Sequence, residues 1–508
     1  LRRMSIIGSN ILAGASGQGG GAGAGYTIEN SLRFRSSASA YLNKTPATVG
    51  NRKTWTYSSW VKRGALGSTQ HLFQSGYSTN PWFAFQFEAN NTIQVSFSAG
   101  TSGGSYTTAV YRDPSAWYHI VLKVDTTQAT AANRVMLYVN NVLQAFGTTN
   151  YPAQNFDTQV NNTLLHTIGG FASLGGYYLD GYMAEVNFID GQALDPSSFG
   201  EYNEDTGVWQ PVAYEGTYGT NGFYLPFSDN TNTTTLAADA SGNGNDWTPN
   251  NISLTAGITY DSMTDTPTPY ADGGNYAVLN PLHKSANATL SDGNLKVRSA
   301  VVGANNFSIA TVTLPTDKVY FEVTAGNNTG AVVVCEVGLV VPTTQTFAGT
   351  NSGIQCVNGG LNKIVNGVYT SIGGGLTTGT VLGFAYDLVN GLMTIYRDGS
   401  AVATDETIPT TFRAVLASVY RDTTNDAGWE FNFGQRPFAH TPPTGFKALH
   451  TGNLPDSTIV SGDDYFKTYL YTGNGGGLQV GEIQKPFTSY EVSNSLRLRS
   501  SASAYLNR

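Results

Sequence analysis

The sequence predicts an all-β chain of tandem β-sandwiches joined by glycine- and proline-rich linkers. Short runs rich in aromatic and β-branched residues recur along it, Asn and Gly turn signals separate them, and no helical periodicity of useful length appears. Charged residues make up 12% of the chain, against a usual share of about 25%. Aromatic residues also reach 12%, which excludes a disordered chain. At 508 residues the chain is too long for one core, and two to four domains are expected.

A near-repeat sets the domain organisation. Residues 26–44 (YTIENSLRFRSSASAYLNK) and 490–508 (YEVSNSLRLRSSASAYLNR) are identical at fourteen of nineteen positions. We therefore expect 490–508 to be the truncated start of a second copy of the first domain, as in modular arrays. The expected order is a Gly-rich N-terminal arm (1–25), a first domain (26–250), a linker (251–275), a second domain (276–450), a linker (451–489) and the repeated segment (490–508).

Alternating and aromatic runs mark the strands of the first domain. Those predicted are 54–61, 82–87, 117–125, 134–139 and 142–144. Asn140 and Asn141 separate the last two runs, and because Asn tolerates positive φ, they predict a tight hairpin. Many short strands at this spacing favour a sandwich or jelly roll.

Several motifs of this domain resemble the laminin-G/concanavalin A-like lectin and glucanase superfamily. The motifs are Trp117 with His119, a strand ending at Asp125, the Leu137–Asn141 hairpin, Ile168-Gly169, and Asp180-Gly181 running to Val186. Asn141 stands where the family usually has Gly, which leaves the turn intact. The resemblance covers most of 26–200 and implies a concanavalin-like sandwich, a fold used both for binding and for catalysis.

The second domain has its own strand pattern and its own resemblance. Strands are predicted at 318–324, 335–340, 381–387, 392–397 and 428–438, with a hairpin turn at Asp398-Gly399. Segments 320–323, 337–339, 383–391 and 395–399 resemble the SPRY family, and 432–438 (NFGQRPF) reproduces its N-F-G-Q-x-P-F element. SPRY modules are binding folds, so the resemblance implies recognition by a second concanavalin-like sandwich.

Charge and hydropathy exclude some partners. A net charge of −8 without a basic run argues against nucleic acid, because phosphate binding needs clustered Lys and Arg. No stretch approaches the ~20 apolar residues of a membrane span, so no membrane insertion is expected. Cys335 and Cys356 have no metal-ligand spacing and are expected to be free buried thiols or one incidental bridge.

The concanavalin-like fold includes glycoside hydrolases, which use two carboxylates about 5 Å apart when they retain configuration, so paired carboxylates would indicate an enzyme. Glu185 has Asn187 and Ile189 at i+2 and i+4, so its strand supplies no partner. His119 lies inside a strand, where a structural imidazole is favoured over a base. We therefore expect no enzyme.

Two groups of residues are candidate sites. Trp82, Tyr177 and Tyr178 lie beside Gly- or Pro-rich turns and would stack on sugar rings, although packing in a core or between subunits is the commoner fate of such side chains. Asp239, Asn243 and Asn245 alternate oxygen-bearing side chains that suit Ca²⁺. The same residues make good Asx turns, and that reading is favoured. No other cofactor is expected.

The laminin-G-like module is followed by FYLPFSDNTN (223–232), DASGNGNDWTPNNIS (239–253), NYAVLNPL (275–282) and the SPRY-like module, and MSIIGSNILAGASG (4–17) lies near the start of the chain. This combination resembles virion structural or tail-fibre proteins of bacteriophages, an analogy between whole proteins and not between sites. It implies a fibre or appendage of the virion whose N-terminal arm docks onto other virion proteins. The sandwiches would attach to a host-surface glycan or receptor, as a homo-oligomer such as a trimer. The alternatives are a capsid- or tube-decorating protein without receptor role, a polysaccharide-degrading enzyme, and an exported cellular adhesin.

Overall fold

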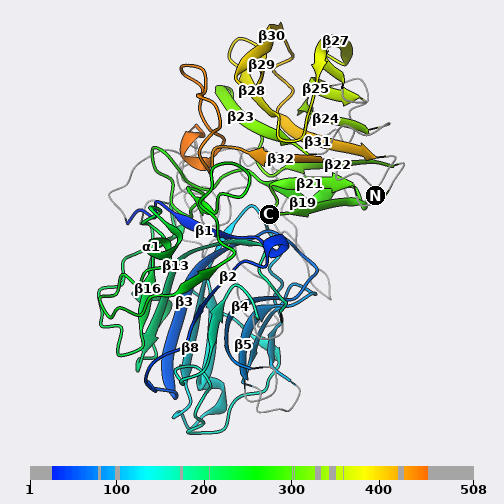
Figure 1. The fold of residues 1–508 in the computed structure, drawn as a ribbon. Coiled ribbons are helices and arrows are strands. Elements are labelled where there is room, and N and C mark those ends of the chain that lie inside the picture. Colours follow the sequence, from blue (N-terminus) through cyan, green and yellow to red (C-terminus); the bar gives the residue numbers. More distant parts are fainter. Residues whose placement is uncertain are drawn as a thin grey trace, which may run out of the picture. The chain divides into compact units, whose positions relative to one another are not determined.

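Two β-sandwiches make up the described part of the chain in this computed structural model (Figure 1). The structure describes residues 26–77, 82–97, 103–171, 175–204, 206–299, 301, 304–326, 333–342, 351–357, 360–421 and 428–455. The expected arm (1–25) and the repeated segment (490–508) lie outside these residues. The predicted all-β class is confirmed. Helical structure in the described residues is limited to α1 (Thr233–Leu236) and the short 3₁₀ turns η1 (Ser36–Ala38), η2 (Ala131–Asn133), η4 (Pro196–Ser198) and η5 (Thr451–Asn453).

The first sandwich consists of two sheets, named here after a central strand of each. The β3 sheet has the order β10 (Val142–Leu143), β9 (Val135–Val139), β8 (Trp117–Asp125), β3 (Thr54–Arg63), β13 (Gly181–Asp190), β1 (Ser31–Phe34) and β18 (Ser262–Met263), with β16 (Phe223–Leu225) also paired to β13. The β5 sheet has the order β11 (Phe146–Thr148), β7 (Ser105–Thr107), β6 (Ile93–Ser96), β5 (Trp82–Phe87), β4 (Gln70–Gly76), β12 (His166–Ile168), β2 (Tyr41–Lys44) and β17 (Thr248–Asn250). A separate ribbon pairs β14 (Gly200–Tyr202) with β15 (Trp209–Pro211).

Alternation along the strands builds the core between these sheets. Tyr57 of β3 and Phe73 of β4 stack with ring centroids 5.1 Å apart, and both are buried.

The predicted hairpin is confirmed, because β9 and β10 pair across Asn140 (φ 49°) and Asn141 (φ 65°). Positive φ at both central residues matches the right-handed twist of the flanking strands.

The second sandwich also consists of two sheets. The β31 sheet has the order β19 (Leu279–Lys284), β22 (Ala304–Ala310), β31 (Ala414–Arg421), β24 (Val333–Val340), β25 (Asn351–Val357), β26 (Gly360–Val365) and β27 (Val368–Gly375). The β23 sheet has the order β20 (Ala288–Ser291), β21 (Lys296–Ser299), β32 (Gly428–Asn432), β23 (Lys318–Ala325), β28 (Val381–Asp387), β29 (Leu392–Arg397) and β30 (Ser400–Thr407).

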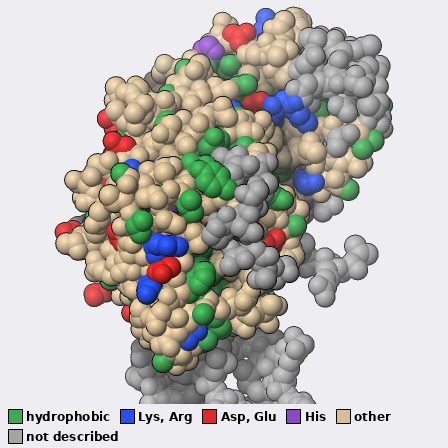
Figure 2. Space-filling model, turned by 60° about the horizontal axis from the view of Figure 1, so that its bottom comes forward, with side chains coloured by type: hydrophobic (Ala, Val, Ile, Leu, Met, Phe, Trp, Pro, Cys, Tyr) green, Lys and Arg blue, Asp and Glu red, His purple; other side chains and the backbone are tan. Residues whose placement is uncertain are grey.

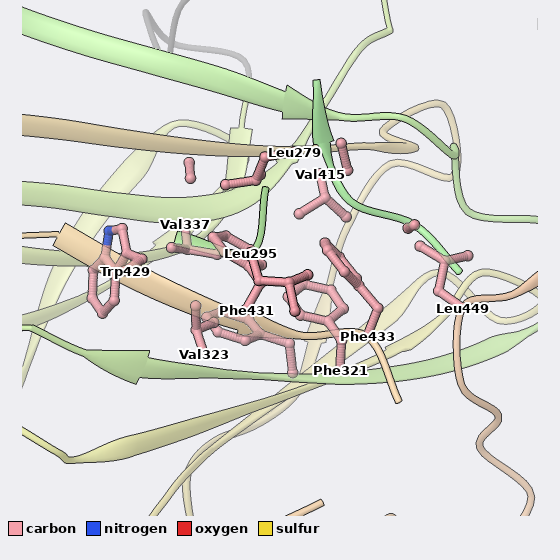
Figure 3. Close-up of a cluster of buried hydrophobic side chains, with 14 of the residues drawn as sticks. Leu279, Leu295, Phe321, Val323, Val337, Val415, Trp429, Phe431, Phe433 and Leu449 are labelled. Carbon is pink, nitrogen blue, oxygen red and sulfur yellow. The ribbon is translucent and has the colours of Figure 1, made fainter. Parts of the chain in front are cut away.

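Aromatic side chains fill the core of the second sandwich (Figure 3). Phe321 lies 5.6 Å from Phe433 between ring centroids, and Val337 and Val415 of the opposite sheet belong to the same buried cluster. The predicted turn is confirmed by positive φ at Asp398 (45°) and Gly399 (81°) between β29 and β30. The run predicted at 428–438 is a strand only over its first five residues, Gly428–Asn432.

The segment expected to be a linker, 251–275, is packed into the structure. Ser262–Met263 forms strand β18 and pairs with β1, although its Pro and Gly neighbours predicted no strand there. The Asp261 carboxylate is fully buried and accepts hydrogen bonds from Arg33 (3.1 Å) and Arg35 (2.8 Å). Two buried guanidinium groups on one carboxylate hold this segment against β1, since breaking such a pair leaves an uncompensated charge.

Candidate functional site

The outward face of the β5 sheet carries the side chains that best resemble a ligand site. On β5, Phe83, Phe85 and Phe87 are fully buried in the core between the sheets. Because successive strand residues point to opposite faces, Trp82 and Gln86 lie on the other face. On β6, Ile93 and Val95 take the core positions, which puts Gln94 and Ser96 on the same outward face.

Three side chains on neighbouring strands form a hydrogen-bonded set that we call the amide row: Gln86, Gln94 and Tyr106. Gln86 Nε2 donates to Gln94 Oε1 (2.7 Å), and Gln94 Nε2 donates to Tyr106 Oη (2.6 Å). Gln86 Nε2 also donates to the Glu88 carboxylate at 2.7 Å. Both Gln side chains are buried, while Tyr106 and Glu88 are half-buried. The row therefore fixes the positions of a phenol and a carboxylate that solvent reaches.

Beside the amide row lies the aromatic cluster, made of His71, Trp82, Phe171 and Tyr177. The Phe171 ring centroid is 5.1 Å from that of His71, 5.7 Å from Trp82 and 6.4 Å from Tyr177. Tyr177 is 48% exposed and Trp82 is half-buried, so both rings are accessible. The structure thus brings two of the three sequence-predicted aromatics together. The third, Tyr178, stacks instead on Tyr41 of β2 at 6.0 Å.

The histidine of this cluster is uncharged at neutral pH. Burial lowers the pKa of His71 to about 3. His71 is directly opposite Gln86 in the β4–β5 pairing, which places the imidazole next to the amide row. Glu88 is then the one charged side chain among the amide row, the aromatic cluster and their direct hydrogen-bond partners. Stacking faces with neutral donors and acceptors suit a polar, uncharged ligand.

Sequence reasoning missed His71, Phe171 and Tyr106. The β4–β5 register shifts between His71 and Phe73, so simple alternation does not assign His71 to a face. Phe171 follows the Ile168-Gly169 motif by two residues and forms an isolated bridge with Gly176. That bridge brings Tyr177 back to the sheet, where its carbonyl accepts the backbone N–H of His71 at 2.9 Å. Both placements depend on contacts between distant segments.

The loop predicted as a calcium candidate is closed by its own hydrogen bonds. Asp239 Oδ1 accepts the backbone N–H groups of Tyr224 (2.9 Å) and Ser241 (2.8 Å), and Oδ2 accepts that of Asn245 (2.8 Å). Asn243 and Asn245 turn their Nδ2 groups toward the backbone carbonyl of Gly222, both at 2.9 Å. This donor set fits Ca²⁺ poorly, because the Asp239 oxygens already have hydrogen-bond partners. The contacts are those of an Asx-type structural loop.

His119 lies in a buried aromatic stack on the outward face of the β3 sheet. Its ring is 4.8 Å from Trp60 and 5.9 Å from Trp209. Trp209 Nε1 donates to His119 Nδ1 at 2.9 Å, and since an indole can only donate, the imidazole proton is on Nε2, 2.9 Å from Ser58 Oγ. Burial lowers the pKa of His119 to about 3. In this tautomer Nε2 cannot take a proton from Ser58, so the pair does not form a nucleophile and base.

Glu185, the acidic residue for which the sequence predicted no catalytic partner, is also buried. It lies at a register shift of β13, with φ 52°, and accepts the hydroxyls of Tyr26 and Tyr224, each at 2.8 Å. Burial raises the pKa of Glu185 to about 7. Both of its oxygens are held by phenols, and its exposed fraction is 7%, which leaves little access for a substrate.

Among the described residues, no three His, Cys, Asp or Glu side chains cluster closely enough to hold a metal ion. No helix within the described ranges combines the length and hydropathy that crossing a membrane requires. Cys335 and Cys356 are directly opposite each other on β24 and β25, and both are buried.

Comparison with known proteins supports the fold of the first sandwich. Residues 34–198 match the model of the concanavalin A-like lectin/glucanases superfamily. No curated protein matches the sequence.

Several solved structures are similar at low identity. A Bacteroides ovatus protein described as carbohydrate binding is 16% identical over 44% of this chain and 59% of its own, with a TM-score of 0.31. Domains LG4-5 of the mouse laminin α1 chain are 10% identical over 85% of this chain and 96% of theirs (TM-score 0.27). The SPRY domain of human HERC1 is 11% identical over 30% of this chain and 96% of its own (TM-score 0.25). With scores this low, these likenesses carry no functional argument. The fold class is that of tandem concanavalin-like β-sandwiches.

Proposed function

We propose that this chain is a non-catalytic structural and attachment protein of a bacteriophage virion that binds a host-surface glycan on the outward face of the β5 sheet. The observation that carries the glycan assignment is the aromatic cluster beside the amide row. Trp82 and Tyr177 supply accessible ring faces around Phe171, and Tyr106 and Glu88 supply polar groups held in position by buried amides. Sugars need this pairing, because their C–H faces stack on rings while their hydroxyls hydrogen-bond at the edge.

The surface composition favours a neutral ligand over an anionic one. The chain has 27 Lys and Arg against 35 Asp and Glu. Figure 2 shows one face of the molecule on which charged side chains are scattered and neutral groups predominate. A phosphate- or sulfate-bearing partner would require clustered cations, and neither the amide row nor the aromatic cluster contains a Lys or Arg.

Two contacts support the non-catalytic part of the proposal. His119 is held by Trp209 in the tautomer that cannot accept a proton from Ser58. Glu185, whose pKa burial raises to about 7, is covered by Tyr26 and Tyr224, which donate their hydroxyls to its two oxygens. The virion assignment rests on the sequence resemblance to phage fibre proteins, and weak sites summed over an oligomer would supply the avidity.

Glycan-array binding of the purified chain tests the site. Stacking of one ring contributes about 1 kcal/mol, so Trp82→Ala and Tyr177→Ala are each expected to weaken binding several-fold to tenfold. Tyr202→Ala is the matched control, since Tyr202 is 51% exposed but lies on β14, away from the β5 sheet. Equal binding by all variants would contradict the proposed site.

Two further measurements separate the alternatives. Release of reducing ends from a bound polysaccharide would show an enzyme and refute the non-catalytic assignment. Immunogold labelling of intact phage particles is expected to locate the protein on the virion. If the protein is found on the particles but the purified chain binds no glycan, a decorating protein would be favoured instead.

A further inference from the structure

A buried lysine, aspartate and asparagine meet where β3 contacts the segment that leads into the second sandwich. Lys62 Nζ lies 2.7 Å from Asp265 Oδ2 and 2.7 Å from Asn275 Oδ1. The side chains of Lys62 and Asp265 are 0% exposed, and Asn275 is 2% exposed. Lys62 Nζ also donates to the carbonyl of Tyr276 at 2.7 Å, so the amine is held from three sides.

The surroundings of this triad are apolar and aromatic. Trp117 is fully buried and donates its Nε1–H to Asp265 Oδ1 at 3.1 Å, while the Tyr182 ring lies 5.8 Å from Lys62 Nζ. Burial is the largest influence on both ionisable groups, and it lowers the pKa of Lys62 and raises that of Asp265. Both directions favour transfer of the shared proton to the carboxylate, which leaves a neutral amine beside a carboxylic acid. A neutral amine is a nucleophile, whereas an ammonium is not.

Hydrogen bonds hold the amide of Asn275 beside the lysine amine. Its Oδ1 faces the Lys62 amine, and its Nδ2 donates to the Ser115 carbonyl at 2.6 Å. The backbone N–H of Asn275 donates to Thr451 Oγ1 at 3.2 Å, which fixes the residue further. The carbonyl carbon is one bond away from an oxygen that already touches the amine. A bound pair at this separation gains the large rate advantage of an intramolecular reaction.

We propose that Lys62 Nζ and Asn275 Cγ join in an intramolecular isopeptide bond, with Asp265 as the catalytic proton shuttle. The amine attacks Cγ, and the protonated Asp265 stabilises the oxygen of the tetrahedral intermediate. Asp265 then takes a proton from Nζ and delivers one to Nδ2, so the Cγ–Nδ2 bond breaks and ammonia leaves. The Nζ–Cγ amide replaces the Cγ–Nδ2 amide, no oxidant or reductant is required, and the departing ammonia carries off the proton that the lysine brought.

The consequence is a covalent tie between the first sandwich and the segment that enters the second. Lys62 and Asn275 are 213 positions apart in the sequence, so the bond would close most of the first sandwich into one loop. Pulling on the chain from either side would then load the cross-link and spare the strands between Lys62 and Asn275, whereas β1, β2 and most of β3 would still carry the load. This inference is independent of glycan binding and of the virion assignment.

Intact-mass measurement of the full chain tests the proposal. The expected mass is that of the sequence less one ammonia, and digestion after denaturation should yield a branched peptide that contains both Lys62 and Asn275. Asp265→Asn keeps both reacting groups and should show the full mass and no branched peptide. Lys62→Arg should do the same, since a guanidinium does not acylate under these conditions.

Four outcomes would overturn the inference. They are a full mass for the wild-type chain, a deficit of one water in place of ammonia, a deficit of one ammonia without the branched peptide, and an unchanged deficit in Lys62→Arg. The second would indicate a Lys62–Asp265 amide, and the third a cyclic imide at Asn275. Because the wild-type mass and its peptide map decide the question by themselves, a variant that fails to fold does not remove the test.

Discussion

Replacing Glu185 by Gln is expected to stabilise the protein at alkaline pH and to flatten its pH dependence. Glu185 is buried on a bulge of β13, and its neighbours are the hydroxyls of Tyr26 and Tyr224. Burial raises its pKa from the usual 4.5 to about 7, against the weaker opposing effect of the two phenol hydrogen bonds. The folded state therefore holds the proton more tightly than the unfolded state does.

The magnitude follows from that shift. A displacement from 4.5 to about 7 corresponds to roughly 3 kcal/mol at about 1.4 kcal/mol for each pH unit. Between these two values the folded chain binds more protons than the unfolded chain, so the free energy of unfolding falls as pH rises. The contribution is fully present below pH 4.5 and lost once pH passes about 7. A glutamine keeps a neutral, hydrogen-bonding group at every pH and avoids the loss.

Urea unfolding followed by tryptophan fluorescence at pH 5 and pH 8 measures the effect. Between pH 5 and pH 8 the free energy of unfolding should fall on the order of 2–3 kcal/mol further in the wild-type chain than in Glu185→Gln. Glu201→Gln is the control, since it also removes one negative charge but from an exposed side chain. Parallel pH profiles for the wild type and Glu185→Gln would refute the reasoning, as would an equal flattening in the control.

Three further substitutions test other parts of the structure. Asp239→Ala removes the acceptor of four hydrogen bonds and should lower the free energy of unfolding by about 2–3 kcal/mol. Added calcium should leave the melting temperature of the wild type unchanged, and a calcium-induced rise would instead indicate that this loop binds the metal. Phe321→Ala opens a cavity at the centre of the second core and should cost about 3–5 kcal/mol in denaturant titration, so a loss below 1 kcal/mol would mean that this core is not packed as described. Asn141→Gly relieves a positive φ in the β9–β10 turn and should change the melting temperature by no more than a few degrees, whereas Asn141→Val should lower it clearly more.

Strands were predictable where one face meets a core and the other meets neutral groups. The limits of β8, β28 and β29 coincide with the runs read from the sequence, because alternation and β-branched content are local properties. Hairpin turns at Asn140-Asn141 and Asp398-Gly399 were predictable for the same reason. These turns require positive φ, and few residue types adopt it readily, so the residue type alone indicates the turn.

The site was predictable only in part. Trp82 and Tyr177 stood out because each lies next to a turn, but the ring that joins them, Phe171, is brought there by its bridge to Gly176. The triad shows the same limit more strongly. Alternation puts Lys62 on the outward face of β3, where solvent is the usual neighbour, yet Asp265 and Asn275 cover it. Contacts across two hundred residues leave no periodic signal in a single sequence.

The near-repeat in the sequence acquires a physical meaning from these contacts. Its conserved polar members in the first copy hold β1 in place: Ser31 donates to the Asp265 carbonyl at 2.6 Å, and Arg33 and Arg35 bind Asp261. Five positions differ between the two copies. The changes at Ile28, Phe34 and Lys44 are conservative, and the side chains of the other two, Thr27 and Glu29, are exposed. A segment copied only for its strand pattern would be free to vary its polar residues. Every arginine and serine of the segment is nevertheless identical in the two copies, and so are several apolar positions. We infer that the repeat retains both the strand pattern and the polar contacts between β1 and the segment that leads to the second sandwich, the same segment that supplies Asp265 and Asn275 to Lys62.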